Sequence, residues 1–298
     1  MIDLRHHIYS LVAVFLALAI GMLIGVAFIA PGTTDARGLA RRQLQIQGLE
    51  QKFTVLHDDL NEKQDRITAM QSQLDNTEQV CKSLLPLVVK KRLAYRNVAI
   101  IQTDGNDTAV AAARSALEMA GANVPCSIRV SPGFATDGKS LSAALSELGI
   151  TPKPEESERI NQGLSVIVDS LIRTRDAYGL TVLEKHGLIT SSGPNDRWIK
   201  AVVVVGGAES SDKNTIQVID LPLIELMKQT RAVIVGCETL DTKNSCIDAY
   251  AGKGISTVDN IDKAAGKIGL IYALLGERGH FGVKPTADRL IPQTLERR

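Results

Sequence analysis

The sequence of 298 residues has little of what an enzyme or a nucleic-acid-binding protein usually shows. Aromatic residues make up 4% of the chain, and 34 Lys and Arg nearly balance 33 Asp and Glu. Base stacking needs aromatic side chains, and phosphate-backbone binding needs surplus positive charge, so we expect no nucleic-acid partner. HExxH and GxSxG patterns are also absent from the sequence. We therefore expect a protein that is not an enzyme and that has no cofactor.

Cysteine is scarce as well. The four cysteines form no CxxC pair and no Cys/His cluster with the spacing of a zinc site; they are Cys81, Cys126, Cys237 and Cys246. An even number permits disulfides, for example between Cys237 and Cys246, but the spacing does not require one. The sequence leaves the metal ligands and the disulfide state open.

The chain does contain an uncharged stretch of 23 residues, from Ile8 to Ala30. As a helix rising about 1.5 Å per residue, it would reach roughly 35 Å, enough to cross a hydrocarbon core of about 30 Å. A cleaved signal peptide is the alternative, since Gly25-Val26-Ala27 resembles a small-residue cleavage site. Signal peptides have a shorter apolar region of about 7–15 residues. The length therefore favours a retained membrane anchor over residues 1–31.

The flanking charges do not settle which side of the membrane the rest of the chain faces. Arg5 precedes the uncharged stretch, and Arg37, Arg41 and Arg42 follow it. The positive-inside rule favours a cytoplasmic C-terminal side, but long translocated domains often do not follow that rule. The sidedness stays open.

A heptad pattern follows the uncharged stretch. With position a at Leu39, most a and d positions as far as Leu84 are apolar, which is typical of a coiled coil. The uncharged stretch also contains a GxxxG step, which lets two helices approach closely. We predict that both features act in dimerisation, through Gly21, Gly25, Leu39, Ile46, Leu49, Phe53, Leu56, Leu60, Ile67, Met70 and Leu74. The alternative is an amphipathic helix that packs on its own domain.

The predicted stalk covers residues 35–85, since Pro86 is expected to end or kink the helix. Residues 95–280 then alternate between β-branched runs and helical patterns. This predicts an α/β fold in three layers around a mostly parallel sheet. The tail, residues 281–298, is rich in proline and charge and is predicted to be flexible. The expected strands are 97–102, 124–130, 201–205, 232–236 and 254–258, and the expected helices are 108–120, 141–148, 155–172, 215–230 and 264–275.

Ligands of open α/β sheets bind beyond the carboxyl ends of the strands, which makes three loops candidate sites. After the first strand, Asp104 and Asp107 could hold a cation, although a turn and a helix N-cap need the same residue types. Gly206 and Gly207 could meet an anion, but their loop is neither GxGxxG nor a P-loop. Cys237 could offer a thiol, although cysteine is more often a small buried hydrophobic residue.

A basic cluster, Lys90-Lys91-Arg92 with Arg96, lies between the stalk and the first strand. Its simplest interpretation is a solvated connector. The functional alternative is contact with anionic lipid headgroups or cell-wall polymers.

Three stretches of the sequence carry a resemblance to a known family. They are residues 1–21, residues 203–208 (Val-Val-Val-Gly-Gly-Ala) and residues 254–262 (Gly-Ile-Ser-Thr-Val-Asp-Asn-Ile-Asp), the last followed by residues 266–275. Together they resemble the mycobacterial copper transport protein B (MctB) family, whose actinobacterial members are also called SteB. The resemblance extends over most of the chain, apart from residues 130–200. It implies either copper handling, as a channel that limits intracellular copper, or a role with a SteA protein in cell separation.

The residues bear on that choice. One membrane helix and an α/β domain do not make a channel, and copper(I) prefers soft ligands. The methionines that could supply such ligands are dispersed, at Met1, Met22, Met70, Met119 and Met227. We therefore expect a dimeric, single-pass envelope protein with an extracytoplasmic domain that binds a SteA-like partner in cell-envelope or cell-separation control. Copper transport or copper homeostasis is the alternative, and copper is the one metal that the resemblance implies.

Overall fold

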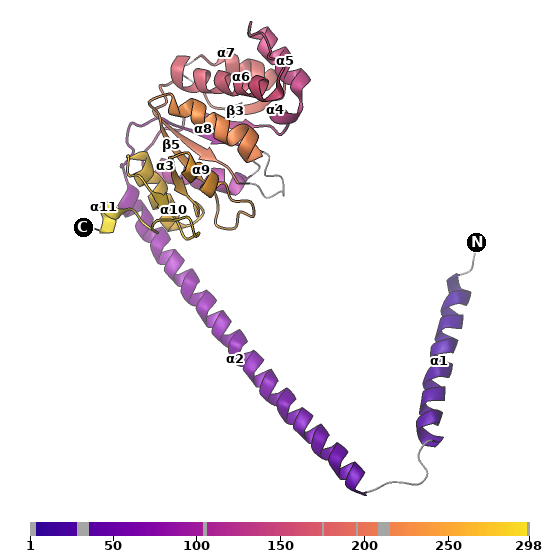
Figure 1. Cartoon of the computed structure of the whole chain (residues 1–298). Coiled ribbons are helices and arrows are strands. Elements are labelled where there is room, and N and C mark those ends of the chain that lie inside the picture. The colour runs from indigo at the N-terminus through magenta and orange to yellow at the C-terminus, as the bar shows by residue number, and fades with distance from the viewer. Residues whose placement is uncertain are drawn as a thin grey trace. The chain divides into compact units, whose positions relative to one another are not determined.

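The computed structural model describes residues 4–28, 36–103, 106–174, 176–194, 196–207 and 215–296 (Figure 1). The chain divides into two compact units, residues 1–73 and residues 74–298. The first unit is helical, and the second contains the α/β domain together with the end of the long helix that leads into it.

The first unit contains α1 (Leu4–Phe28) and most of α2 (Ala36–Val89). The large apolar side chains described in α1 are exposed, with fractions from 48% to 71% between Leu11 and Ile24. Within the described residues, no helix has both the length and the hydropathy of a membrane span. The membrane anchor expected over residues 1–31 therefore stays a prediction.

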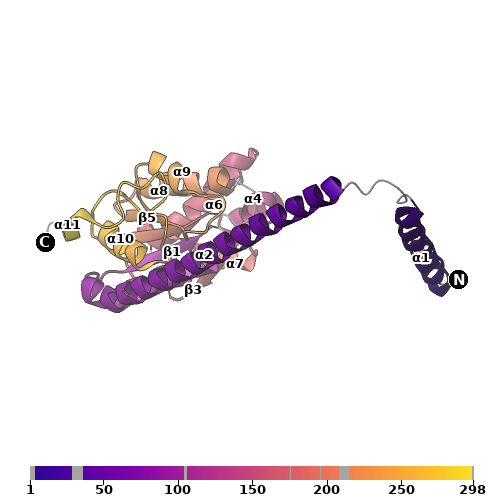
Figure 2. The same cartoon turned by 90° about the horizontal axis from the view of Figure 1, so that it is seen from below.

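Helix α2 runs without interruption through the predicted stalk and past Pro86 to Val89 (Figure 2). Pro86 was expected to end or kink the helix; it does not end it, and the kink stays a prediction. Proline costs one hydrogen bond inside a helix, but the turn that contains it is anchored by packing, since Leu85 and Val89 are buried in the domain core. The helical pattern continues beyond the proline, where Lys90 N donates to Pro86 O at 2.9 Å.

The second unit is built on a sheet of seven strands in the order β3-β2-β1-β4-β5-β6-β7. Neighbouring strands are parallel except β2 and β3, which confirms the predicted mostly parallel α/β sheet. The central strands are aliphatic because both faces of a parallel sheet are covered. The strands are β1 (Val98–Gln102), β2 (Ser127–Val130), β3 (Ile189–Ser192), β4 (Ala201–Val205), β5 (Val233–Cys237), β6 (Ser256–Val258) and β7 (His280–Phe281).

Two apolar cores lie on the two faces of this sheet. Alternate residues of β4 enter different cores, with Val202 and Val204 in one and Val203 and Val205 in the other. The end of α2 packs with α3 (Asp107–Met119) and α10 (Ala264–Leu274) on the second face (Figure 1). The first face is covered by α4 (Gly133–Thr136), α5 (Gly138–Glu147), α6 (Glu156–Val168), α7 (Tyr178–Lys185), α8 (Leu221–Lys228) and α9 (Ile247–Gly252).

Some predicted elements differ in detail from those observed. Helix α6 continues through Gly163, where the absence of a side chain lets Phe134 and Leu141 pack closely: a Cβ there would lie 2.8 Å from an atom of each. The helix expected at 155–172 ends in a π-helix, Asp169–Thr174, and the one expected at 215–230 begins in another, Ile216–Asp220. Strand β3 was not predicted, since its sequence Ile-Thr-Ser-Ser reads as polar; it lies at the edge of the sheet, where polar residues are tolerated.

Two glycines make room for one fully buried tyrosine beneath the sheet. A Cβ at Gly236 in β5 would lie 2.2 Å from Tyr250 Cδ2, and a Cβ at Gly206 would lie 2.1 Å from the Tyr250 hydroxyl oxygen. That hydroxyl donates to Asp220 Oδ2 at 2.6 Å, and both side chains are buried. Tyr250 cannot move aside without breaking this hydrogen bond.

We expect Gly236→Ala to destabilise the full chain by about 2 kcal/mol or more, because an added methyl group overpacks this contact. The matched control is Gly252→Ala at the end of α9, where no atom lies within 4 Å of the added Cβ. It should be neutral or slightly stabilising, since alanine has less freedom in the unfolded chain. Denaturation midpoints measure both variants, and equal midpoints would contradict the packing argument.

Candidate functional site

Polar side chains gather beyond the carboxyl ends of β1, β4, β5 and β6. Strand β1 lies between β2 and β4: the strands that follow β1 directly in sequence are on one side of it, and β4 to β7 are on the other. Such a switch point is where doubly wound sheets bind ligands. We call the hydrogen-bonded polar residues at this edge, some buried and some partly exposed, the carboxyl-edge cluster: Asn106, Glu238, Thr239, Thr242, Ser245, Cys246, Asp259 and Lys284.

Glu238, at the centre of this cluster, follows β5 directly and is fully buried. Its carboxylate accepts hydrogen bonds from Ser245 Oγ at 2.6 Å and from Cys246 N at 2.8 Å. It also pairs with the ammonium group of Lys284, whose side chain is only 17% exposed. Burying a charge is costly unless it is paired and hydrogen-bonded. Glu238 meets both conditions, so its charge is compensated within the protein.

Lys284 is held in place through its backbone by Asp259, which follows β6. The buried Asp259 carboxylate accepts from Val283 N at 3.0 Å and from Lys284 N at 2.7 Å. Gly282 makes this approach possible: its φ is +150°, and a Cβ there would lie 1.9 Å from Asp259 Oδ1. A side chain at position 282 would separate the two segments.

The start of the tail, predicted to be flexible from residue 281, is therefore anchored. Phe281 is buried in β7, Gly282 N donates to Arg289 O at 2.9 Å, and Asp288 N donates to His280 O at 2.7 Å. Its attachment to the rest of the domain comes from the pairing of β7 with β6 and from the hydrogen bonds to Asp259, which local composition does not reveal. A short helix, α11 (Gln293–Glu296), follows.

The first candidate loop is used for helix capping. Asn106 Oδ1 accepts from Ala109 N at 3.0 Å, and its Nδ2 donates to Thr239 Oγ1 at 3.0 Å, which joins the loops after β1 and β5. Asp107 lies outside the cluster and forms an ion pair with Arg129 of β2. A hydrogen bond from Gln102 and the charge of Arg129 lower the pKa of Asp107. Asp104 lies outside the described residues.

The other two candidate loops also serve packing. Gly206 accommodates Tyr250, as described above. Gly207 has a φ of +87°, and a Cβ there would lie 2.7 Å from Thr242 Cγ2 and 3.0 Å from Glu238 Oε2. Cys237 is fully buried, and burial raises the pKa of its thiol. The structure brings Gly207 and Cys237 next to the cluster, but as packing positions.

The residues that dominate this edge, Glu238, Asp259 and Lys284, were not predicted as site residues. Glu238 directly follows Cys237, which was a predicted site residue. Asp259 belongs to the Ser-Thr-Val-Asp stretch that carries the family resemblance, so both residues adjoin a pattern that the sequence analysis used. Lys284 had no comparable signal, because its role depends on a contact 46 residues away in sequence.

Soft metal ligands are not gathered in the described part of the chain, where no three His, Cys, Asp or Glu residues are grouped to hold a metal ion. All four cysteines are free, so Cys237 and Cys246 form no disulfide. Burial raises the pKa of the Cys246 thiol and raises that of Cys126 to about 11. Cys81 is exposed, whereas the other three cysteines are buried.

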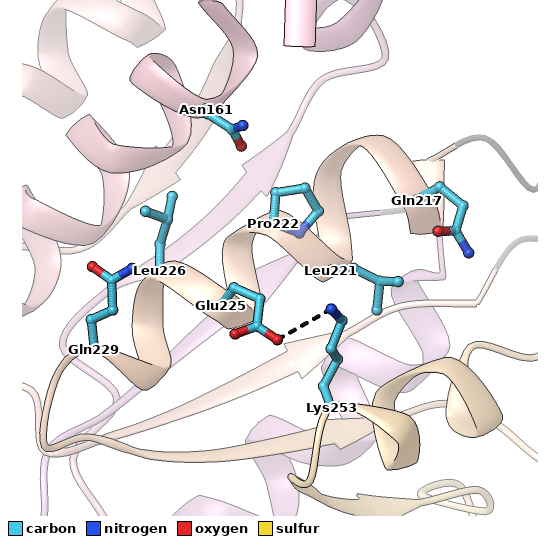
Figure 3. Close-up of a pocket in the computed structure, with 8 residues that line it drawn as sticks. All are labelled: Asn161, Gln217, Leu221, Pro222, Glu225, Leu226, Gln229 and Lys253. Atoms are coloured by element: carbon cyan, nitrogen blue, oxygen red, sulfur yellow. Dashed lines mark ion pairs between the residues drawn. The ribbon is translucent and has the colours of Figure 1, made fainter. Parts of the chain in front are cut away.

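An open groove of about 500 Å³ lies on the helical layer beside α8, away from every residue predicted as a ligand site (Figure 3). Glu225 and Lys253 form an ion pair across it at 3.2 Å, and the hydrogen bond from Lys253 lowers the pKa of Glu225. Amides and aliphatic side chains form the remainder, which suits contact with another molecule more than catalysis. The lining residues are Asn161, Gln217, Leu221, Pro222, Glu225, Leu226, Gln229 and Lys253.

Comparison with known proteins gives a consistent result over nearly the whole chain. The family model described as "Copper transport outer membrane protein, MctB" matches residues 1–292. Proteins named "Copper transporter MctB" from Mycobacterium bovis and Mycobacterium tuberculosis are each 27% identical to this chain, and the alignment covers 95% of this chain and 96% of theirs. Among solved structures, a putative aspartate carbamoyltransferase from Trypanosoma cruzi aligns with 66% of this chain and 91% of its own at 11% identity, with a TM-score of 0.17. That score is too low to support an argument.

We expect Lys284→Met to destabilise the full chain by about 3 kcal/mol, because it leaves the buried Glu238 carboxylate without its counter-charge. The control is Lys228→Met, which removes a half-exposed ion pair with Glu225 at 3.6 Å and should cost about 1 kcal/mol or less. A double variant, Glu238→Gln with Lys284→Met, should recover part of the loss. Denaturation midpoints test the series, and a Lys284→Met variant as stable as the control would contradict the role of the pair.

Proposed function

The chain belongs to the MctB family, and on that premise we propose that it acts in copper homeostasis of the cell envelope. We propose further that it does so as a membrane-anchored dimer whose α/β domain binds a partner and catalyses no reaction. The family's description and its relatives' names support the copper part of this proposal. The anchor, the dimer and the partner rest on the residues of the chain.

The exposed seam of α2 is the observation on which the dimer rests. Eight apolar side chains at a and d positions are between 48% and 73% exposed: Ile46, Leu49, Phe53, Leu56, Leu60, Ile67, Met70 and Leu74. Fully burying one such side chain contributes about 1.5–3 kcal/mol. A second copy of the helix, packed knobs-into-holes along this seam, would bury all eight. The side chain of Leu39, the first seam position, lies outside the described residues.

The proposed anchor acts in the same direction. Two chains anchored at their N-terminal ends in one membrane leave it side by side, which favours a parallel pair. Gly21 and Gly25 have no atom within 4 Å of the position a Cβ would take, so this face is open to a second helix. Polar residues at two d positions, Lys63 and Thr77, disfavour shifted registers. We propose a single-pass envelope protein with an extracytoplasmic domain.

The proposed lack of catalysis is supported by the state of the carboxyl-edge cluster. Glu238 and Lys284 neutralise each other, and the pKa of the neighbouring Cys246 thiol is raised. A general base, a nucleophile or a metal ligand must be free to react. These groups are instead engaged with one another.

Cell-separation control with a SteA-like partner is the second candidate. It rests on the family resemblance and on the groove beside α8, where Leu221, Pro222 and Leu226 present apolar surface next to amide groups (Figure 3). This composition suits a protein partner. Both candidates use the same dimeric, anchored architecture. They differ in the process that the chain serves: copper homeostasis in the first, cell separation in the second.

We expect the double variant Phe53→Glu/Leu60→Glu to weaken self-association of the full chain at least tenfold, because it places charges in the seam. The matched control, Thr54→Glu/Val55→Glu, adds the same charges at exposed b and c positions and should associate like the unmodified chain. Val55 is 68% exposed and Phe53 73%, so exposure does not distinguish the pairs. Sedimentation equilibrium in non-ionic micelles measures the difference; equal weakening by both variants would refute the seam.

We expect copper(I) retained against a chelating dye to depend on Cys81 alone, at no more than one copper per two chains. Cys81→Ser should abolish retention, whereas Cys126→Ala should leave it unchanged, because the Cys126 thiol is buried and its pKa is raised to about 11. Retention of several copper ions by the folded Cys81→Ser chain would show that the domain itself carries copper, against a role exercised through a partner.

A further inference from the structure

The amino ends of β4 and β5 form a hollow on the edge of the sheet opposite the carboxyl-edge cluster. Its volume is about 350 Å³. Ile172, Ile199 and Ala232 give it an apolar floor, and Arg173, Lys200 and Arg231 lie around it. Ile199 is buried, while all three basic side chains are exposed. The hollow therefore combines an apolar base with a basic rim.

Two of these three cations are not neutralised. Arg173 pairs with Asp169 at 2.6 Å. Within the described part of the chain, Lys200 and Arg231 make no ion pair and no side-chain hydrogen bond. Exposed cations are common, but two unpaired ones on a single hollow leave a local surplus of two positive charges in a chain whose formal net charge is only +1.

The surplus is local to this hollow. A second hollow of about 390 Å³ shares Ala232 with the first and is lined by both Arg278 and Glu277. The Glu277 carboxylate accepts from Gln293 N at 2.5 Å and from Thr294 Oγ1 at 2.6 Å, both neutral donors, so its charge offsets that of Arg278. The first hollow has no carboxylate among its lining residues.

We propose that the hollow between the amino ends of β4 and β5 binds a phosphate group. The planar guanidinium of Arg231 matches two phosphate oxygens, and the ammonium of Lys200 supplies a point charge. Their combined charge equals that of a phosphate monoester near neutral pH, whereas a single carboxylate would leave one cation unmatched. The apolar floor accommodates the carbon atoms that carry the phosphate. The hollow borders the groove beside α8, with which it shares Gln229, but the two basic residues of the proposal line the hollow alone.

The test measures binding of inorganic pyrophosphate to the full chain in non-ionic micelles by calorimetry. Lys200→Gln/Arg231→Gln should weaken binding at least tenfold. The matched control, Lys153→Gln/Lys243→Gln, removes two exposed lysines elsewhere and should change affinity less than twofold. The charge-conserving variant Lys200→Arg should keep most of the affinity. Equal weakening by the two double variants, or no binding by the unmodified chain, would overturn the proposal.

The source of the phosphate is distinguished by competition. Mixed micelles containing phosphatidic acid, whose headgroup is a phosphate monoester, should displace pyrophosphate from the unmodified chain if the natural ligand is a lipid headgroup, and phosphatidylcholine micelles serve as the comparison. A failure of phosphatidic acid to compete, with pyrophosphate binding still dependent on Lys200 and Arg231, assigns the site to a soluble or polymer-borne phosphate. Unchanged melting temperatures for all variants exclude unfolding as the cause of any loss.

Discussion

The α/β domain depends on the neutralisation of one buried carboxylate. Glu238 stands at the end of a central strand with no access to water, so the chain must bring a cation to it. Lys284 is that cation, and it comes from a segment that Asp259 fastens by backbone hydrogen bonds. The edge at which related architectures open to ligands is thereby closed by the protein's own chain. The paired charges hold this edge of the domain in one arrangement. Binding of another molecule would then use the outer surfaces of the domain.

The two units differ in how much of their apolar surface is buried. The domain has a core on each face of its sheet and buries the large apolar side chains of its central strands. The stalk is the opposite, because its apolar seam remains exposed from Ile46 to Leu84. Water contact with so long an apolar stripe is unfavourable, and this is the physical ground for the proposed dimer.

The elements that could be predicted from the sequence are those with a strong local signal. The aliphatic runs of β4 and β5 and the helix at α10 were expected close to their observed bounds. Strand β3 was missed because its four residues have no clear alternation, and Pro86 misled because tertiary packing outweighed its local effect. The site was harder: Gly206 and Gly207 predict a ligand loop, which stays a prediction, while the sequence did not reveal that they also make room for Tyr250 and Thr242. Lys284 depends on a long-range contact, for which one sequence offers no pattern.

The continuity of α2 into the core has a consequence for how dimers would be arranged. At its end, the helix buries Leu85 and Val89 in the domain, while Leu84 on the heptad seam remains 51% exposed. At about 100° per residue, the direction of the seam and the direction of the docked face differ by about a quarter turn around the helix axis. The two contacts therefore do not compete for the same surface. In the proposed dimer, residues near the end of α2 can thus serve the seam without withdrawing Leu85 and Val89 from the core.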